Sequence, residues 1–181
     1  PSSAHSGDTC VATRIDSTYA NNVSTRLISP PVTIPQADQT PRLRFWHWYY
    51  FTVADNDYGQ VQIRAVGDTT WTALATYYNH GGGIWTQPYI PLLDYAGQTV
   101  EFSFYFHSDG GYKERGWYID DVSIEDGERI FTSVEDWESG LDDWYVDAGT
   151  WDIGTPTGGP DGAYGGSSCI ATRLDNDYSN N

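Results

Sequence analysis

Carboxylates with the spacing of calcium ligands are the first residues in this sequence that could support chemistry. Asp55-Asn56-Asp57 offers oxygen atoms at alternate positions, as calcium loops do, although this triplet between two strands is first of all typical of a turn. Asp120 and Asp121 end a strand-like stretch, and strand alternation should send their side chains to opposite faces, so that only one points inward. An inward carboxylate needs a cation or several hydrogen-bond donors to offset its desolvation. Further candidate ligands are Asp16, Asp175 and Asp177.

Aromatic side chains form the second group, because sugar-binding sandwiches present flat rings beside carboxylates and amides. The chain has 8 Trp and 14 Tyr residues. The candidate rings are Trp46, Trp48, Tyr49, Tyr50, Tyr77, Tyr78 and Trp85. The stretch 43–51 is aromatic at both alternating positions, which predicts a central strand covered on both sides, or a strand with one face on a partner. Trp and Tyr are enriched at interfaces, so self-association is the alternative use of these rings.

Motifs for catalysis are missing from the sequence. The histidines, which are His5, His47, His80 and His107, show no HExxH or related zinc spacing, and neither a GxSxG elbow nor a GxxxxGK[ST] loop occurs. Paired carboxylates are expected in a chain with 25 acidic residues, so they give little support for a glycoside hydrolase. The protein is therefore predicted not to be an enzyme.

The charge balance narrows the range of partners. Nine Lys and Arg residues against 25 Asp and Glu residues give a net charge of −16. Such a surface repels phosphate backbones and anionic lipids, which argues against a nucleic-acid partner, and it suits calcium. The sequence contains no apolar run near the roughly 18 residues of a membrane-spanning helix, so no membrane insertion is expected.

Hydrophobic residues alternate with a period of two along most of the chain, which is typical of strands. Val100, Phe102, Phe104 and Phe106 alternate with Glu101, Ser103, Tyr105 and His107, the pattern of a half-buried strand. Strands are predicted near 43–51, 60–65, 71–78, 84–91, 100–107, 117–124, 128–134, 144–153 and 167–174, with one short helical turn at 92–96. Many short strands separated by Gly- and Pro-rich turns predict an all-β sandwich.

An internal repeat is the most informative feature of the sequence. Residues 10–22 read CVATRIDSTYANN, and residues 169–181 read CIATRLDNDYSNN, 159 residues later. Because 159 residues is a usual size for one domain, we interpret the chain as a tandem array cut out of phase with its units. Cys10 and Cys169 are then the same position in successive units, so no disulfide between them is expected within one chain.

The repeat divides the chain into 1–124, the C-terminal part of one unit, and 125–181, the N-terminal strands of the next. An isolated half-sheet would expose unpaired backbone, so both parts need completion. Covalent neighbours or other copies packed head to tail could supply it. Alternatively, residues 125–159 fold back onto 1–124, in which case 1–22 and 160–181 would compete for one slot.

Several stretches resemble MAM-like jelly-roll domains of secreted bacterial proteins, of the cleaved-adhesin and choice-of-anchor J types. The matching stretches are RLISPPVTI (26–34), RLRFWHWY (42–49), YAGQTVEFSFYFHSDGG (95–111), GWYIDDVSI (116–124) and DWESGLDDWYVDAGTWDIG (136–154). The resemblance implies an antiparallel jelly-roll sandwich, often stabilised by calcium and usually non-catalytic. It also implies that Glu138 and Asp121 lie near a metal site, with a carboxylate bonded to backbone amides as the alternative.

These observations together predict an extracellular or cell-surface protein. The main hypothesis is a structural or adhesive repeat domain that assembles head to tail into a fibre, stalk or surface array by sharing strands, with other copies of itself as partners. The alternative is a carbohydrate- or protein-binding accessory module of a secreted enzyme, with polysaccharide as a possible ligand.

Overall fold

The computed structural model describes residues 1–53, 56–129, 134–146, 151–175 and 177, and their regular structure consists of strands and two short 3-10 helices. The strands are β1 (Val11–Ala12), β2 (Ser24–Ile28), β3 (Val32–Thr33), β4 (Arg42–Tyr50), β5 (Tyr58–Ala65), β6 (Thr72–Tyr78), β7 (Tyr89–Pro91), β8 (Thr99–His107), β9 (Gly116–Glu125), β10 (Asp152–Gly154) and β11 (Cys169–Ala171). The 3-10 helices are η1 (Ala37–Gln39) and η2 (Leu93–Tyr95).

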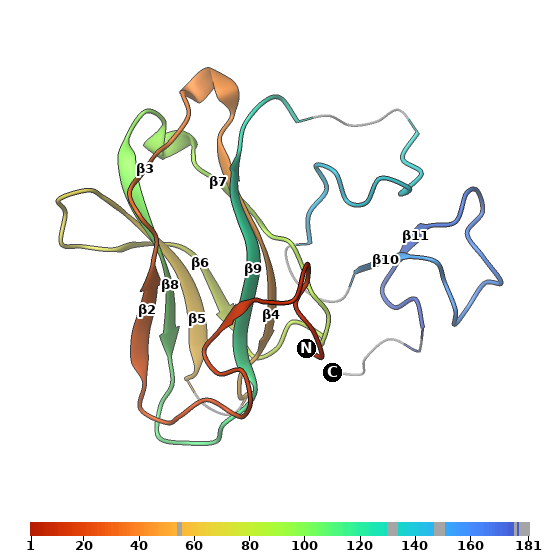
Figure 1. The fold of residues 1–181 in the computed structure, drawn as a ribbon, viewed down its shortest axis with the longest axis horizontal. Helices are drawn as coiled ribbons and strands as arrows, with labels where there is room; N and C mark the ends of the chain where they lie inside the picture. The colour runs from red at the N-terminus through yellow and green to blue at the C-terminus, as the bar shows by residue number, and fades with distance from the viewer. Residues whose placement is uncertain (54–55, 130–133, 147–150, 176, 178–181) are drawn as a thin grey trace.

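Two antiparallel sheets make up the body of the molecule (Figure 1). Sheet A has the strand order β1-β9-β4-β7, and sheet B has the order β2-β8-β5-β6, with β3 also paired to β8. β10 and β11 form a separate two-stranded ribbon to one side of these sheets (Figure 1). The predicted all-β antiparallel sandwich is therefore confirmed, while the division into tandem units stays a prediction.

The core lies between the two sheets and follows the alternation seen in the sequence. On β8, Val100, Phe102 and Phe106 are buried in the core, and Phe104 packs against it. Trp117 of β9 enters the core from the opposite sheet, with its ring 5.6 Å from that of Phe104. Burial of these side chains is the main force that holds the sheets together.

Both faces of β4 are covered, as its aromatic pattern predicts. Phe45 and His47 point into the core, whereas Arg42 and Arg44 lie on the outer face and are still only 5% and 0% exposed. The chain after β9 covers them: Arg42 Nη2 donates to Asp143 Oδ1 at 2.9 Å, and Arg44 Nη2 donates to the Trp144 carbonyl at 3.1 Å. The described part of 125–146 therefore folds back onto sheet A of its own chain.

The strand predictions differ from the structure mainly at their limits. The strand expected at 84–91 shortens to β7, and the helical turn expected at 92–96 is η2. The strands expected at 144–153 and 167–174 shorten to β10 and β11, with 147–150 outside the described residues. Most of the strand expected at 128–134 also falls outside them. β1, β2 and β3 carry no periodic apolar signal, because they lie at sheet edges and are largely exposed.

His47 predicts a dependence of stability on pH. Its ring is buried, which lowers its pKa from 6.5 to about 3, and Trp117 Nε1 donates to its Nδ1 at 3.3 Å. Between these two pKa values the unfolded chain binds a proton that the folded chain does not, so the free energy of unfolding should fall as the pH falls.

Urea unfolding at about pH 7.5 and about pH 5 would measure this effect. Below pH ~6.5, the free energy of unfolding of the wild type should fall by up to about 1.4 kcal/mol per pH unit more than that of His47→Gln, because glutamine does not titrate. Equal losses in the two proteins would contradict the assignment of the pH dependence to His47.

Candidate functional site

An aromatic groove lies on the outer face of sheet A, where β4 turns Trp46 away from the core. We call it the tryptophan groove and define it by Trp46, Trp85, Trp151, His5 and Asp152. It encloses about 330 Å³. The full lining is His5, Trp46, Ile84, Trp85, Thr86, Leu141, Val146, Trp151, Asp152 and Ile153. The groove thus combines residues from the N-terminal segment, sheet A and the C-terminal segment.

Trp46 is the centre of this groove. The His5 ring stacks on it with centroids 3.7 Å apart and planes at 12°, and Trp85 meets the edge of His5 at 6.0 Å. Trp151 also lines the groove and is half-exposed. His47 N–H and Thr86 N–H each donate to the other residue's carbonyl at 2.9 Å, and this bridge fixes the Trp85 loop against β4.

Two carboxylates hold His5 in its place over Trp46. His5 N–H donates to Asp120 Oδ2 at 3.0 Å, and His5 Nδ1 lies 2.7 Å from Asp121 Oδ2. Ser6 Oγ donates to Asp121 Oδ1 at 2.6 Å. These hydrogen bonds, that of Ser6 first and that of His5 second, lower the pKa of Asp121.

The prediction that Asp120 and Asp121 point to opposite faces is wrong. β9 does not end at these residues, and its pairing with β4 shifts between Arg44 and Trp46 in a β-bulge. Asp121 takes a left-handed conformation there, with φ of 46°. An extra residue in one strand interrupts the alternation, so both carboxylates reach the same N-terminal segment.

Asp152 also lines the groove. Burial raises its pKa, and a hydrogen bond from the Ile153 N–H works against this shift. The groove therefore combines indole side chains with an acidic residue, and such groups are able to contact a polyhydroxylated ring. Flat apolar surface contacts its C–H groups, and the carboxylate accepts from its hydroxyls.

The predicted aromatic residues divide among several places. The structure brings Trp46 and Trp85 together in the groove. Trp48 and Tyr50 form a separate row further along β4, with ring centroids 6.2 Å apart. Tyr78 is exposed on sheet B, 5.8 Å from the Tyr58 ring. Tyr49 and Tyr77, which the sequence analysis also named, belong to the core.

Asp57, one of the predicted calcium ligands, is buried and bonded to neutral donors. Its Oδ2 accepts from the hydroxyls of Tyr19 and Thr52, and its Oδ1 accepts from the Asp109 N–H at 2.8 Å. It thus joins the N-terminal segment to two loops of the sandwich. Asp55, the other predicted ligand of this turn, lies outside the described residues.

Glu138 and Asp121 accept hydrogen bonds from different segments of the chain, Glu138 from 167–168 and Asp121 from 5–6. Glu138 accepts from the N–H groups of Ser167 and Ser168, both at 2.7 Å, and from Ser167 Oγ at 2.8 Å. These hydrogen bonds, led by that of the Ser168 N–H, lower its pKa. Across the described residues, no cluster of three or more His, Cys, Asp or Glu side chains could hold a metal ion.

The remaining candidates lie apart from the groove. Asp16 pairs with Arg14 at 3.4 Å, and Asp175 pairs with Arg173 at 3.5 Å, both as local ion pairs. Asp177 is not among the residues that line the groove. Cys10 and Cys169 are free thiols.

Sequence reasoning missed His5, Trp151 and Asp152. His5 is held by residues 115 and 116 positions away, so no local pattern reveals it. Trp151 and Asp152 lie in the stretch 136–154 that carries the family resemblance, and the TWD sequence at 150–152 is the signal that could have pointed to them.

Comparison with known proteins finds relatives among proteases. The chain matches no protein-family model. Bacillopeptidase F of Bacillus subtilis is 34% identical over 126 residues, which cover 70% of this chain and 9% of that protein. The pre-pro-metalloprotease PrtV of Vibrio cholerae is 32% identical over 107 residues, which cover 54% of this chain and 11% of that protein. The chain therefore spans about a tenth of the length of these relatives.

Two solved structures are similar in part. The K3 cleaved adhesin domain of Lys-gingipain from Porphyromonas gingivalis has 20% identity and a TM-score of 0.44, covering 64% of this chain and 73% of that chain. TmCBM61 in complex with β-1,4-galactotriose has 16% identity and a TM-score of 0.41, covering 68% and 74%. Among the described residues of this chain, no helix has the length and apolar character to cross a membrane.

Calcium dependence stays a prediction that a melting experiment can test. If the folded protein alone binds the ion, excess chelator should lower the melting temperature, and added calcium should restore it by mass action. Asp121→Asn and Glu138→Gln should each reduce this difference if their carboxylates are ligands. Identical melting curves of the wild type with chelator and with calcium would contradict a calcium site.

Proposed function

We propose that this chain is a non-catalytic accessory module of a larger secreted protein, and that it binds carbohydrate in the tryptophan groove. The observation that carries the proposal is the arrangement of Trp46, Trp85 and Trp151 around a groove with Asp152 at its wall. These three indoles do not belong to the core, which lies between the sheets.

The relatives support a role as part of a larger protein. Both are named as proteases, and the chain matches about a tenth of each. A segment of that size corresponds to a single domain within a long chain. The prefix pre-pro in the name of PrtV denotes an exported precursor, which supports an extracellular or cell-surface location for this chain as well.

The geometry of the acidic residues supports a binding function over hydrolysis. Glycoside hydrolases need two carboxylates facing each other across the sugar. Asp152 is the single acidic residue among the described residues that line the groove. His47 is buried in the core and does not line the groove.

Loss of one indole should weaken sugar binding without unfolding the protein. A panel of soluble polysaccharides would first be screened by affinity electrophoresis. For those bound, Trp85→Ala and Trp151→Ala should each reduce affinity by about 10-fold or more, or about 1.4 kcal/mol, because each removes a stacking face.

Trp71→Ala is the matched control for this experiment. Trp71 contacts the Arg64 guanidinium at 4.4 Å and does not line the groove, so its loss should leave affinity unchanged. The proposal fails if the wild type binds no polysaccharide of the panel, or if Trp71→Ala weakens binding as much as the groove variants do.

Self-assembly is a second candidate function, and the repeated segment favours it. Residues 10–22 and 169–181 carry nearly the same sequence at the two ends of the chain, and each copy pairs with a different strand. Copies could then share strands head to tail to form a fibre, stalk or surface array. A contact that joins unlike surfaces of successive copies gives rings or open filaments.

Electron microscopy and sedimentation would test this assembly. At high concentration with calcium present, the chain should form end-to-end oligomers whose length grows with concentration. A monodisperse monomer under these conditions would contradict the assembly hypothesis while leaving the carbohydrate-binding proposal standing.

A further inference from the structure

β1 and β11 are the same strand of the repeat, but each has a different neighbour. Val11 and Ala12 of β1 pair with Ile119 and Tyr118 of β9. Their counterparts 159 residues later, Ile170 and Ala171 of β11, pair with Ile153 and Asp152 of β10. Neither copy has both neighbours among the described residues. Combining the two pairings on one strand requires β9 to bond one edge of that strand and β10 to bond the other.

The hydrogen bonds of β1 show which edge is open. Thr13 N–H donates to the Trp117 carbonyl at 2.9 Å, so the main-chain groups of Thr13 and, two residues earlier, Val11 point toward β9. The groups of Cys10 and Ala12 therefore point to the opposite edge, where no strand of the described chain pairs. An open edge of this kind is a template for another strand.

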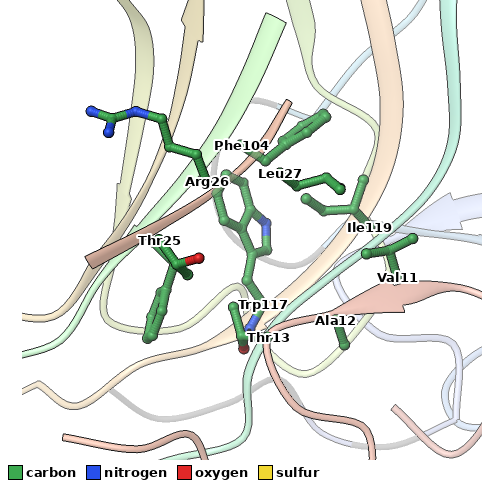
Figure 2. Close-up of a pocket in the computed structure, with 10 residues that line it drawn as sticks. Val11, Ala12, Thr13, Thr25, Arg26, Leu27, Phe104, Trp117 and Ile119 are labelled. Atoms are coloured by element: carbon green, nitrogen blue, oxygen red, sulfur yellow. Dashed lines mark hydrogen bonds between the residues drawn. The ribbon is translucent and has the colours of Figure 1, made fainter. Parts of the chain in front are cut away.

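The sandwich is also open at its flank beside β1. A pocket of about 260 Å³ lies there between the edge strands β1 and β2, and Figure 2 shows Val11, Leu27, Phe104, Trp117 and Ile119 around it. Val11 and Leu27 are about half-exposed, at 51% and 46%. Apolar side chains from both sheets thus reach solvent at the edge where a further strand of sheet A would lie.

We propose that β11 of a second copy of this chain replaces β1 on β9, and that its β10 becomes a fifth strand of sheet A over the pocket. The proposal rests on the self-assembly function and names its docking surface. Joining the two observed registers places Ile119, Ile170 and Ile153 in one cross-strand row. Since Ile119 lines the pocket, this row would close the flank with apolar contacts.

Thr13, Tyr19 and Asn21 help to anchor the N-terminal segment, and the repeat preserves all three residue types. Thr13 Oγ1 accepts from the Trp117 N–H at 3.1 Å, Tyr19 donates to Asp57, and Asn21 Nδ2 donates to the carbonyls of Gly110 and Gly111. The equivalent residues of the C-terminal copy are identical, namely Thr172, Tyr178 and Asn180. At these three positions the incoming segment therefore has the same residue types as the segment it replaces.

Two side-chain contacts, those of His5 and Ser6 with Asp121, have no equivalent in the C-terminal copy and oppose the exchange. Tyr164 and Gly165 stand where His5 and Ser6 hold Asp121, so the bonds to Asp121 belong to the N-terminal copy alone. Tyr164 is fully exposed in its own chain. Because it is the equivalent of His5 in the repeat, its ring would lie on Trp46 of the neighbouring copy after the exchange. The donor copy keeps its β10–β11 pairing and the bonds of Glu138 to Ser167 and Ser168.

Matched proline variants test the exchange in the full chain. Val11→Pro removes the N–H that bonds β9, so it should loosen the internal occupant and raise the association constant about 10-fold in sedimentation velocity. Ile170→Pro damages the donor and should abolish this gain in the double variant. A Val11→Pro protein that associates no more than wild type would overturn the proposal, provided that its circular dichroism is native.

Disulfide trapping by mixing two chains tests the register. With Cys10→Ser and Cys169→Ser as background, one chain carries Ala171→Cys and the other Tyr118→Cys, which are opposite each other in the proposed pairing. Oxidation of the mixture should give a mixed dimer joined at these positions, identified by mass spectrometry. The intrachain control Ala12→Cys with Tyr118→Cys reports the observed register and the folding of the Tyr118 variant.

The outcomes separate the docking surface from assembly in general. Oligomers without the mixed dimer, while the intrachain control forms, would show that copies associate elsewhere and would overturn this surface alone. A second cysteine pair replaces Val11 in one chain and Ile153 in the other. If this pair forms a mixed dimer and the pair at Ala171 and Tyr118 does not, β10 of one copy lies beside β1 of the other without β11 replacing β1. That outcome also overturns the proposal. A monomer throughout would remove both this surface and the assembly hypothesis.

Discussion

The packing of Trp117 between the two sheets is the contact on which the rest of the structure depends. Its ring is buried against Gly59 of β5, where a β-carbon would lie 2.6 Å from the indole. Only glycine leaves room for so close an approach of the two sheets at this point. Because Trp117 fixes β9 from the inside, the outer side of that strand can hold Asp120 and Asp121 in place, and its edge can carry β1.

Charge fixes the C-terminal segment in a different way. Arg42 and Arg44 lie on a sheet face that would otherwise be open, and in a chain of net charge −16 they are buried beneath acidic and carbonyl partners. Glu125 adds an ion pair to Arg42 at 3.3 Å. A buried cation is destabilising without such partners. Arg42 and Arg44 therefore depend on the C-terminal segment for their partners, and their hydrogen bonds in turn hold that segment on the sheet. Burial lowers the pKa of Arg44, and Glu125 opposes that shift.

Some of this organisation can be predicted from the sequence, and some cannot. The alternation of β8 and the aromatic pattern of β4 reflect burial that is local in the chain, so the sandwich and the cover on the outer face of β4 were predictable. β2 is exposed along its whole length and has no such pattern. The bulge at Asp121 was not predictable either, because aspartate tolerates the left-handed conformation without requiring it. The groove depends on contacts across more than a hundred residues, which periodicity does not record.

Because the His5 ring stacks on Trp46, the placement of the N-terminal segment is coupled to the binding of any other ring on that indole. Since one ring at a time can cover this face, the His5 ring would compete there with either proposed ligand, a sugar or Tyr164 of another copy. By thermodynamic linkage this competition is reciprocal: if one ring lowers the affinity of another for the indole by some factor, the second lowers the affinity of the first by the same factor. Binding of another ring to Trp46 should therefore favour release of the N-terminal residues, and their release should favour such binding.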